Sequence, residues 1–158
     1  MTSKSNSQYG KNHFFFRGTD GFIFKPNIKK SDILHIFHRD YCRSIPLKFD
    51  KEITDPHGIP GYRFVPTPNA YGTPQENPDN ACFCNNPGGC PDVPSGVFNI
   101  SICQYGSPVM LSWPHFFQAD AKLVEAVEGL KPNKNDHQFY IDAQPVRKII
   151  KYLIQIGI

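Results

Sequence analysis

The sequence predicts a mainly β domain with short helices that is linked by disulfides. The 158 residues include 15 prolines and 12 glycines, a content that argues against long helices. Several short segments alternate apolar and polar residues, as half-buried strands do. The stretch 77–103 holds four of the five cysteines and the sequon Asn99-Ile100-Ser101, which together indicate an oxidising lumen.

Length, charge and the chain ends limit the possible classes of protein. The length suits one domain, and 13 phenylalanines with seven tyrosines supply large apolar groups for one core. The formal charge of +3 comes without a cluster denser than Lys29-Lys30 or Arg147-Lys148, so we expect no nucleic-acid partner. The polar start lacks a signal-peptide core, and apolar residues 149–158 are half the roughly 20 that span a bilayer.

The first half of the chain predicts one helix and two strands. Residues 1–17 show no clear period and receive no assignment. A Ser31 N-cap before apolar residues at helical spacing predicts a short helix over 31–37. Alternation predicts a strand over 42–49, in which Pro46 suits an edge or a bulge better than a central position. A turn over 57–61 leads to a short strand over 62–65.

The cysteine-rich stretch is read from its spacing. Cys82 and Cys84 are separated by one residue, so they share a face on an extended chain. Turn-forming residues 85–89 make a ring between Cys84 and Cys90 easy to close. Because five cysteines is an odd count, one of them has a partner outside the chain, stays a free thiol, or belongs with a missing piece.

The second half predicts a further strand over 97–103, with Phe98, Ile100 and Ile102 on the apolar side and Asn99 on the other. This parity fits a glycan on Asn99, although an unmodified solvent-facing asparagine explains it too. Further strands are expected over 108–113, 139–141 and 149–158. A helix is expected over 120–129, with Asp120 as its N-cap and Gly129 as its end. Its apolar face consists of Leu123, Val124 and Val127.

Two other chemistries are weaker interpretations. Zinc ligands are available in Cys82, Cys84, Cys90 and Cys103 with His57 or His115, but closely spaced Cys-x-x-Cys pairs are absent. Ser112, His115 and Asp120 are the residue types of a hydrolase, but no nucleophile-elbow pattern surrounds Ser112. We therefore predict no metal, no cofactor and no enzyme. His115 is interpreted as a packed, hydrogen-bonded core histidine and His137 as a residue that stabilises a turn.

Several motifs, in one order and at compatible spacing over about 18–146, carry a family resemblance. They are Cys42-Arg43-Ser44, Gly58-Ile59-Pro60, Tyr62-Arg63-Phe64, Glu76-Asn77-Pro78-Asp79-Asn80, Cys82-Phe83-Cys84, Gly96-Val97-Phe98-Asn99-Ile100-Ser101-Ile102-Cys103, Pro114-His115-Phe116, Ala119-Asp120, Glu128-Gly129-Leu130, Pro132-Asn133, His137 and Asp142. This set resembles the class B scavenger receptor family, which includes the fatty acid translocase, the lysosomal integral membrane proteins and the insect sensory neuron membrane proteins.

The resemblance implies a part of a larger membrane protein. Family members have a transmembrane helix near each end and one ectodomain, an irregular antiparallel β-barrel with a helical apex and a lipid-conducting tunnel. The chain resembles the later half of that ectodomain and would lack both transmembrane helices. Phe98, Ile100 and Ile102 would then line the tunnel or pack in the core. We divide the chain into an unassigned segment 1–17, for which misassignment is the alternative, a partial ectodomain 18–146 and a divergent terminal strand 147–158.

The resemblance also assigns the cysteines. By position, Cys42 would pair with Cys103 and Cys84 with Cys90. Cys82 would pair with a cysteine that the family has where His13 stands here, so it is unpaired in this chain.

The function expected from the resemblance is that of a receptor fragment. The parent molecule would bind lipids, fatty acids or lipoprotein particles and mediate their uptake or transfer. It would reside in the plasma membrane or the lysosomal membrane, with this segment extracellular or lumenal. The alternative is a free-standing secreted or lysosomal disulfide-linked module that binds a protein partner.

Overall fold

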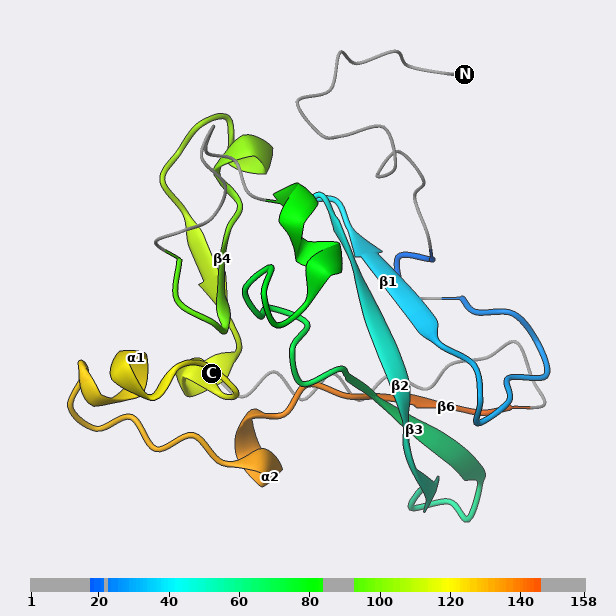
Figure 1. The fold of residues 1–158 in the computed structure, drawn as a ribbon. Coiled ribbons are helices and arrows are strands. Elements are labelled where there is room, and N and C mark those ends of the chain that lie inside the picture. Colours follow the sequence, from blue (N-terminus) through cyan, green and yellow to red (C-terminus); the bar gives the residue numbers. More distant parts are fainter. Residues whose placement is uncertain (1–17, 22, 84–92, 146–158) are drawn as a thin grey trace, which may run out of the picture.

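The computed structural model describes residues 18–21, 23–83 and 93–145. Its larger sheet has four antiparallel strands in the order β1-β2-β3-β6, and a smaller sheet pairs β4 with β5. Figure 1 shows the larger sheet curling like part of a barrel wall, with the β4 hairpin to one side. The fold is therefore mainly β with short helices, as the sequence predicts.

Six strands and five short helices lie within the described residues. The strands are β1 (Leu34–His38), β2 (Arg43–Thr54), β3 (Pro60–Pro66), β4 (Val97–Asn99), β5 (Met110–Ser112) and β6 (Ile141–Ala143). The helices are η1 (Pro78–Phe83), η2 (Ser101–Gln104), η3 (Pro114–Phe116), α1 (Ala121–Glu125) and α2 (Lys134–His137). None of the helices in the described part of the chain has both the length and the apolar character needed to cross a bilayer.

The long strand β2 forms because its apolar residues alternate. Ile45 and Leu47 are buried, and they lie opposite Ile36 and Leu34 of β1. The predicted strand over 42–49 is thus present, and it continues to Thr54 because β3 pairs with its second half.

The predicted helix over 31–37 is wrong, because this segment contains strand β1. Leu34 and Ile36 are buried at a period of two, whereas Ile33 is exposed. A helix this short gains little by itself, and pairing with β2 satisfies the backbone instead. The expected Ser31 cap gives way to a turn in which Asp32 Oδ2 accepts from the Lys29 backbone N–H over 2.7 Å.

Pro46 lies in a strand that has neighbours on both sides. It pairs with His35 of β1, and the register with β3 begins only at the next residue, where Leu47 lies opposite Pro66. On its β3 side, β2 is therefore an edge at Pro46, which is where a proline is tolerated.

The turn predicted over 57–61 is present as a loop closed by Asp55. Its Oδ1 accepts from the backbone N–H groups of His57 and Ile59, both over 2.8 Å. β3 then begins at Pro60 and contains the predicted strand over 62–65.

The strand predicted over 97–103 is wrong in its second half. β4 ends at Asn99, and η2 begins at Ser101. Phe98 and Ile100 are buried as predicted, but Ile102 is 41% exposed because the helical turn breaks the period of two. The hairpin closes with β5, inside the strand predicted over 108–113.

The later elements are shorter than predicted. Asp120 caps α1, since its Oδ1 accepts from the Lys122 backbone N–H over 3.0 Å, but the helix ends at Glu125 and Val127 is 49% exposed. The strand predicted over 139–141 is displaced, because β6 begins at Ile141. The strand predicted over 149–158 lies outside the described residues.

One core joins the two sheets. Phe64 and Leu47 are fully buried in the larger sheet, and Phe98 and Trp113 enter from the side of the hairpin. Tyr71, in the loop after β3, stacks on the Trp113 ring with centroids 4.4 Å apart. This loop therefore fills the space between the sheets.

Candidate functional site

The Cys42–Cys103 disulfide links the two sheets. Cys42 immediately precedes β2, Cys103 lies in η2, and their Cα atoms are 5.9 Å apart. Beside the bond, the Gln104 side-chain amide donates to the Asp40 carbonyl over 2.9 Å. Closing a loop of this length stabilises a fold by about 4 kcal/mol on the chain-entropy model. The pairing implied by the family resemblance is present.

Arg43, the first residue of β2, is only 4% exposed. One guanidinium nitrogen donates to the Ala70 carbonyl over 2.5 Å and to Asn80 Oδ1. The guanidinium carbon lies 4.3 Å from the centre of the Phe83 ring and 5.1 Å from that of Phe98. A buried cation is costly unless it is hydrogen-bonded, and aromatic faces attract it. We name Arg43, Tyr71, Asn80, Phe83 and Phe98 the Arg43 cage.

Asn80 connects the cage to the loop after β3. Its Nδ2 donates to the Gly72 carbonyl over 2.7 Å and to the Ala70 carbonyl over 3.2 Å. Tyr71 lies between Ala70 and Gly72 in the chain, and burial raises the pKa of its hydroxyl. Because the cage is filled by its own side chains, its role is structural. Sequence reasoning gave Arg43 and Asn80 no role, although both stand in the motifs that carry the family resemblance.

Glu76 fastens the same loop to the segment before β4. Its Oε2 accepts from Ser95 Oγ over 2.6 Å and from the Thr73 backbone N–H over 2.8 Å. These hydrogen bonds lower the pKa of the Glu76 carboxyl below its usual value, and the bond from Ser95 has the largest effect. Gly96 follows with a φ of +87°, and a Cβ there would lie 2.3 Å from the Ala119 Cβ. The backbone is therefore closely packed at this point.

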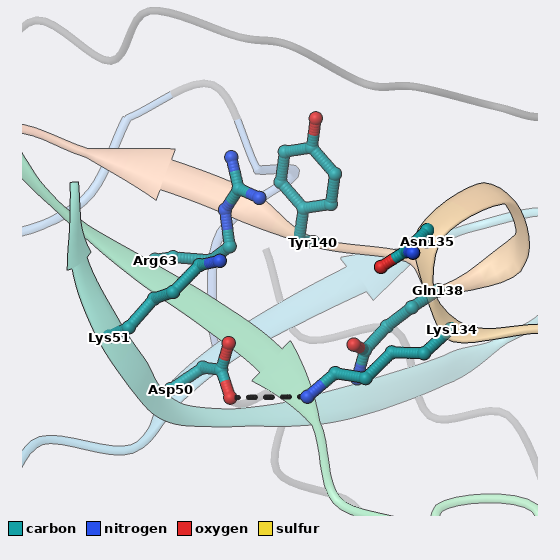
Figure 2. A pocket seen from close by; sticks show the side chains of 7 residues that line it. All are labelled: Asp50, Lys51, Arg63, Lys134, Asn135, Gln138 and Tyr140. Atoms are coloured by element: carbon teal, nitrogen blue, oxygen red, sulfur yellow. Dashed lines mark ion pairs between the residues drawn. The ribbon is translucent and has the colours of Figure 1, made fainter. Parts of the chain in front are cut away.

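A polar pocket of about 110 Å³ lies at the other end of β2 (Figure 2). Figure 2 shows side chains from β2, β3 and α2 around the space, together with Gln138 just after α2 and Tyr140 just before β6. The lining residues are Asp50, Lys51, Arg63, Lys134, Asn135, Gln138 and Tyr140. Sequence reasoning missed this pocket, because its residues come from segments that only the fold brings together.

Charges lie side by side across three strands at this pocket. Lys51 of β2 is directly opposite Arg63 of β3, and Arg63 is directly opposite Asp142 of β6. Arg63 donates to both carboxylate oxygens of Asp142 over 2.7 Å, and its guanidinium carbon lies 3.6 Å from the centre of the Tyr140 ring. This bonding raises the pKa of Arg63. The guanidinium is therefore held in one orientation beside the pocket.

The second ion pair at the pocket is loose. Lys134 Nζ lies 3.7 Å from Asp50 Oδ1, with the lysine side chain 64% exposed. Charge-assisted hydrogen bonds are usually about 2.7–2.9 Å long. Within the described residues, Lys51 has no ion-pair partner.

The predicted glycosylation site lies at the end of β4. Asn99 is half-buried, and its Oδ1 accepts from the Ser101 backbone N–H over 2.8 Å. Its modification stays a prediction. The backbone of Cys82 lies in η1, while Cys84 and Cys90 lie outside the described residues, so the second disulfide also stays a prediction.

The residues weighed for metal and hydrolase chemistry have other surroundings. Over the described residues, no three His, Cys, Asp or Glu side chains are grouped to hold a metal ion. Ser112 Oγ donates to the Trp113 carbonyl over 3.0 Å, and Asp120 caps α1.

His115 and His137 pack against each other. Their rings stack with centroids 4.2 Å apart. His115 is thus packed and half-buried, and its buried Nδ1 has no hydrogen-bond partner among the described residues. His137 Nδ1 accepts from the Asn133 backbone N–H over 2.9 Å, within the turn of α2.

The chain is similar to known proteins over most of its length. The model of the CD36 family matches residues 3–149. Lysosome membrane protein 2 of Homo sapiens is 42% identical over 134 residues, which cover 84% of this chain and 27% of the relative. Protein peste of Drosophila melanogaster is 37% identical over 128 residues, 81% of this chain and 22% of the relative.

A third relative extends the match. Scavenger receptor class B member 1 of Cricetulus griseus is 34% identical over 148 residues, 93% of this chain and 28% of the relative. The chain thus spans about a quarter of the length of the curated relatives it matches.

Proposed function

The chain belongs to the CD36 family, and on that premise we propose that it forms part of a membrane scavenger receptor that binds lipids or lipoproteins and mediates their uptake or transfer. The family match carries this proposal. The segment would lie on the extracellular or lumenal side of a plasma or lysosomal membrane. The scavenger receptors of this family are generally non-enzymatic, and we propose no catalytic role.

The Cys42–Cys103 disulfide supports the proposed side of the membrane. Disulfides form and persist in oxidising compartments such as the secretory lumen and the cell exterior. The sequon at Asn99 fits the same compartment.

The described structure limits where lipid contacts are sought. Phe98 and Ile100 are buried in the core that joins the sheets, so packing accounts for them. Ile102 is exposed and does not share their face. We therefore assign no tunnel-lining role to these three residues.

A receptor chimera tests the proposal. This chain replaces the matching segment of the Cricetulus griseus scavenger receptor, and cells that display the chimera are given fluorescent lipoprotein particles. We expect surface delivery and uptake of the particles. In a Cys42→Ser version, loss of the link between the sheets is expected to stop glycan maturation and surface delivery.

The possible failures of this experiment are distinguishable. A chimera that reaches the surface but takes up no more lipoprotein than untransfected cells contradicts the lipid-receptor function. Normal maturation of the Cys42→Ser version contradicts the requirement for the disulfide instead.

A further inference from the structure

We propose that the polar pocket between β2, β3 and α2 binds one anionic group, a carboxylate or a phosphate, held by Lys51, Arg63 and Lys134. All three cations line the same space, and Asp50 is the only carboxylate in that lining. The inference goes beyond the proposed function, since it rests on the geometry of the pocket rather than on the family.

A β-bulge directs the charged residues of β2 into the pocket. The register with β3 passes from Phe49 opposite Phe64 to Lys51 opposite Arg63, so Asp50 is the extra residue. In a regular strand, consecutive side chains point to opposite faces. Here consecutive Asp50 and Lys51 both line the pocket, as a bulge allows.

The charge balance of the pocket favours an anion. Arg63 and Asp142 neutralise each other, and Lys134 and Asp50 form the loose pair. Lys51, which lies directly opposite Arg63 in the register of the two strands, then remains as an uncompensated positive charge. Like charges directly opposite each other on neighbouring strands are destabilising. An anion between them would relieve this repulsion.

The hydrogen-bond donors are also suited to an anion. The Arg63 guanidinium has five N–H groups, of which Asp142 takes two. Lys134, held only loosely by Asp50, can turn to a stronger acceptor in the same space. The side-chain amides of Asn135 and Gln138 add neutral donors. A space of about 110 Å³ holds more than a single water molecule.

The test is a titration of the full 158-residue chain with anions, in which the NMR signals of the backbone amides report binding. The probes are sodium phosphate, sodium hexanoate, and vesicles of phosphatidylglycerol or phosphatidylcholine, all at low ionic strength because salt screens exposed charges. We expect phosphate and hexanoate to shift the amide signals of Lys51, Arg63 and Gln138. A response to hexanoate and phosphatidylglycerol without one to free phosphate would assign the site to a lipid-borne anion.

Matched variants separate the pocket from general surface charge. Lys51→Gln is expected to weaken anion binding about tenfold, because one charge-assisted hydrogen bond is lost. Lys48→Gln removes an exposed lysine of the same strand that does not line the pocket, and it should leave binding unchanged. Asp50→Asn should strengthen binding, since it frees Lys134 and removes the competing carboxylate.

Two results would overturn the proposal. One is the absence of any shift at these amides with all four probes while the chain is folded. The other is an equal loss of binding in Lys51→Gln and Lys48→Gln, which would show that only overall charge matters.

Discussion

The two ends of β2 use positive charge in opposite ways. At the first end, Arg43 is buried with its guanidinium bonded to Ala70 and Asn80. At the second end, Lys51 is exposed, beyond a bulge, and faces another cation across the ladder. Both residues belong to one continuous strand, so the difference comes from what is packed against each end.

This difference shows how burial decides the role of a charge. The loop after β3 covers Arg43 and supplies the Ala70 carbonyl and the Tyr71 ring, which makes the cation part of the core. At Lys51 the neighbours are charged side chains around an open space, and the cation stays available to a ligand. Stability is therefore concentrated at the first end and recognition at the second.

Replacing each cation by methionine is the strongest test of this division. Arg43→Met is expected to lower the free energy of unfolding by about 3 kcal/mol, because the Ala70 carbonyl and Asn80 Oδ1 both lose a buried, charged donor. Lys51→Met, at an exposed position, should change it by less than about 0.5 kcal/mol. Urea unfolding of the oxidised chain measures both, and equal effects would show that the two ends do not differ.

Two glycines sharpen the comparison at the level of the backbone. Gly96 (φ +87°), close to the cage, and Gly58 (φ +80°), in the turn after β2, are both left-handed. Gly96→Ala is expected to lower the free energy of unfolding by about 3 kcal/mol, because the alanine has an unfavourable φ and its Cβ also clashes with Ala119. Gly58→Ala is expected to lower it by about 1 kcal/mol, because the Cβ would meet no neighbouring atom and only the unfavourable φ remains. A Gly96→Ala protein as stable as Gly58→Ala would contradict close packing at the first end.

The smallest expected effect concerns Glu76, an exposed acid that fastens the cage loop. Glu76→Gln should cost less than about 1 kcal/mol at pH 7. Folding lowers the pKa of this carboxyl. Its contribution to the free energy of unfolding is therefore complete above the ordinary pKa of 4.5 and is lost as pH falls through the folded-state pKa. Urea unfolding from pH 7 to pH 3 should therefore show the two proteins converging in acid. A constant difference would contradict this ionic role.

Alternation was sufficient to locate β2, the longest strand of the core. Ile45 and Leu47 of β2 are buried because one face of a sheet with a period of two packs inward. The Asp120 cap is equally local, since it depends only on a hydrogen bond to the residue two positions later. Such features depend on neighbours in the chain and are therefore readable from it.

The errors occur where a distant partner decides. Residues 31–37 carry both a helical and a strand spacing, and pairing with β2 selects the strand. Ile102 fits an alternating strand, but the hairpin turns at Ser101, so Ile102 is exposed. In both cases the local pattern allows two structures, and tertiary contacts stabilise only one of them.

The sequence by itself determined the mainly β class, the family and, through that family, the Cys42–Cys103 pairing. These depend on residue order and spacing, which the chain carries with it. Only the tertiary structure decided the Arg43 cage and the polar pocket. Arg43 and Asn80 are 37 positions apart, and Arg63 and Asp142 are 79 apart. Side chains so distant meet only after strands have paired and the loop has packed, because no local pattern of residues encodes which faces come together.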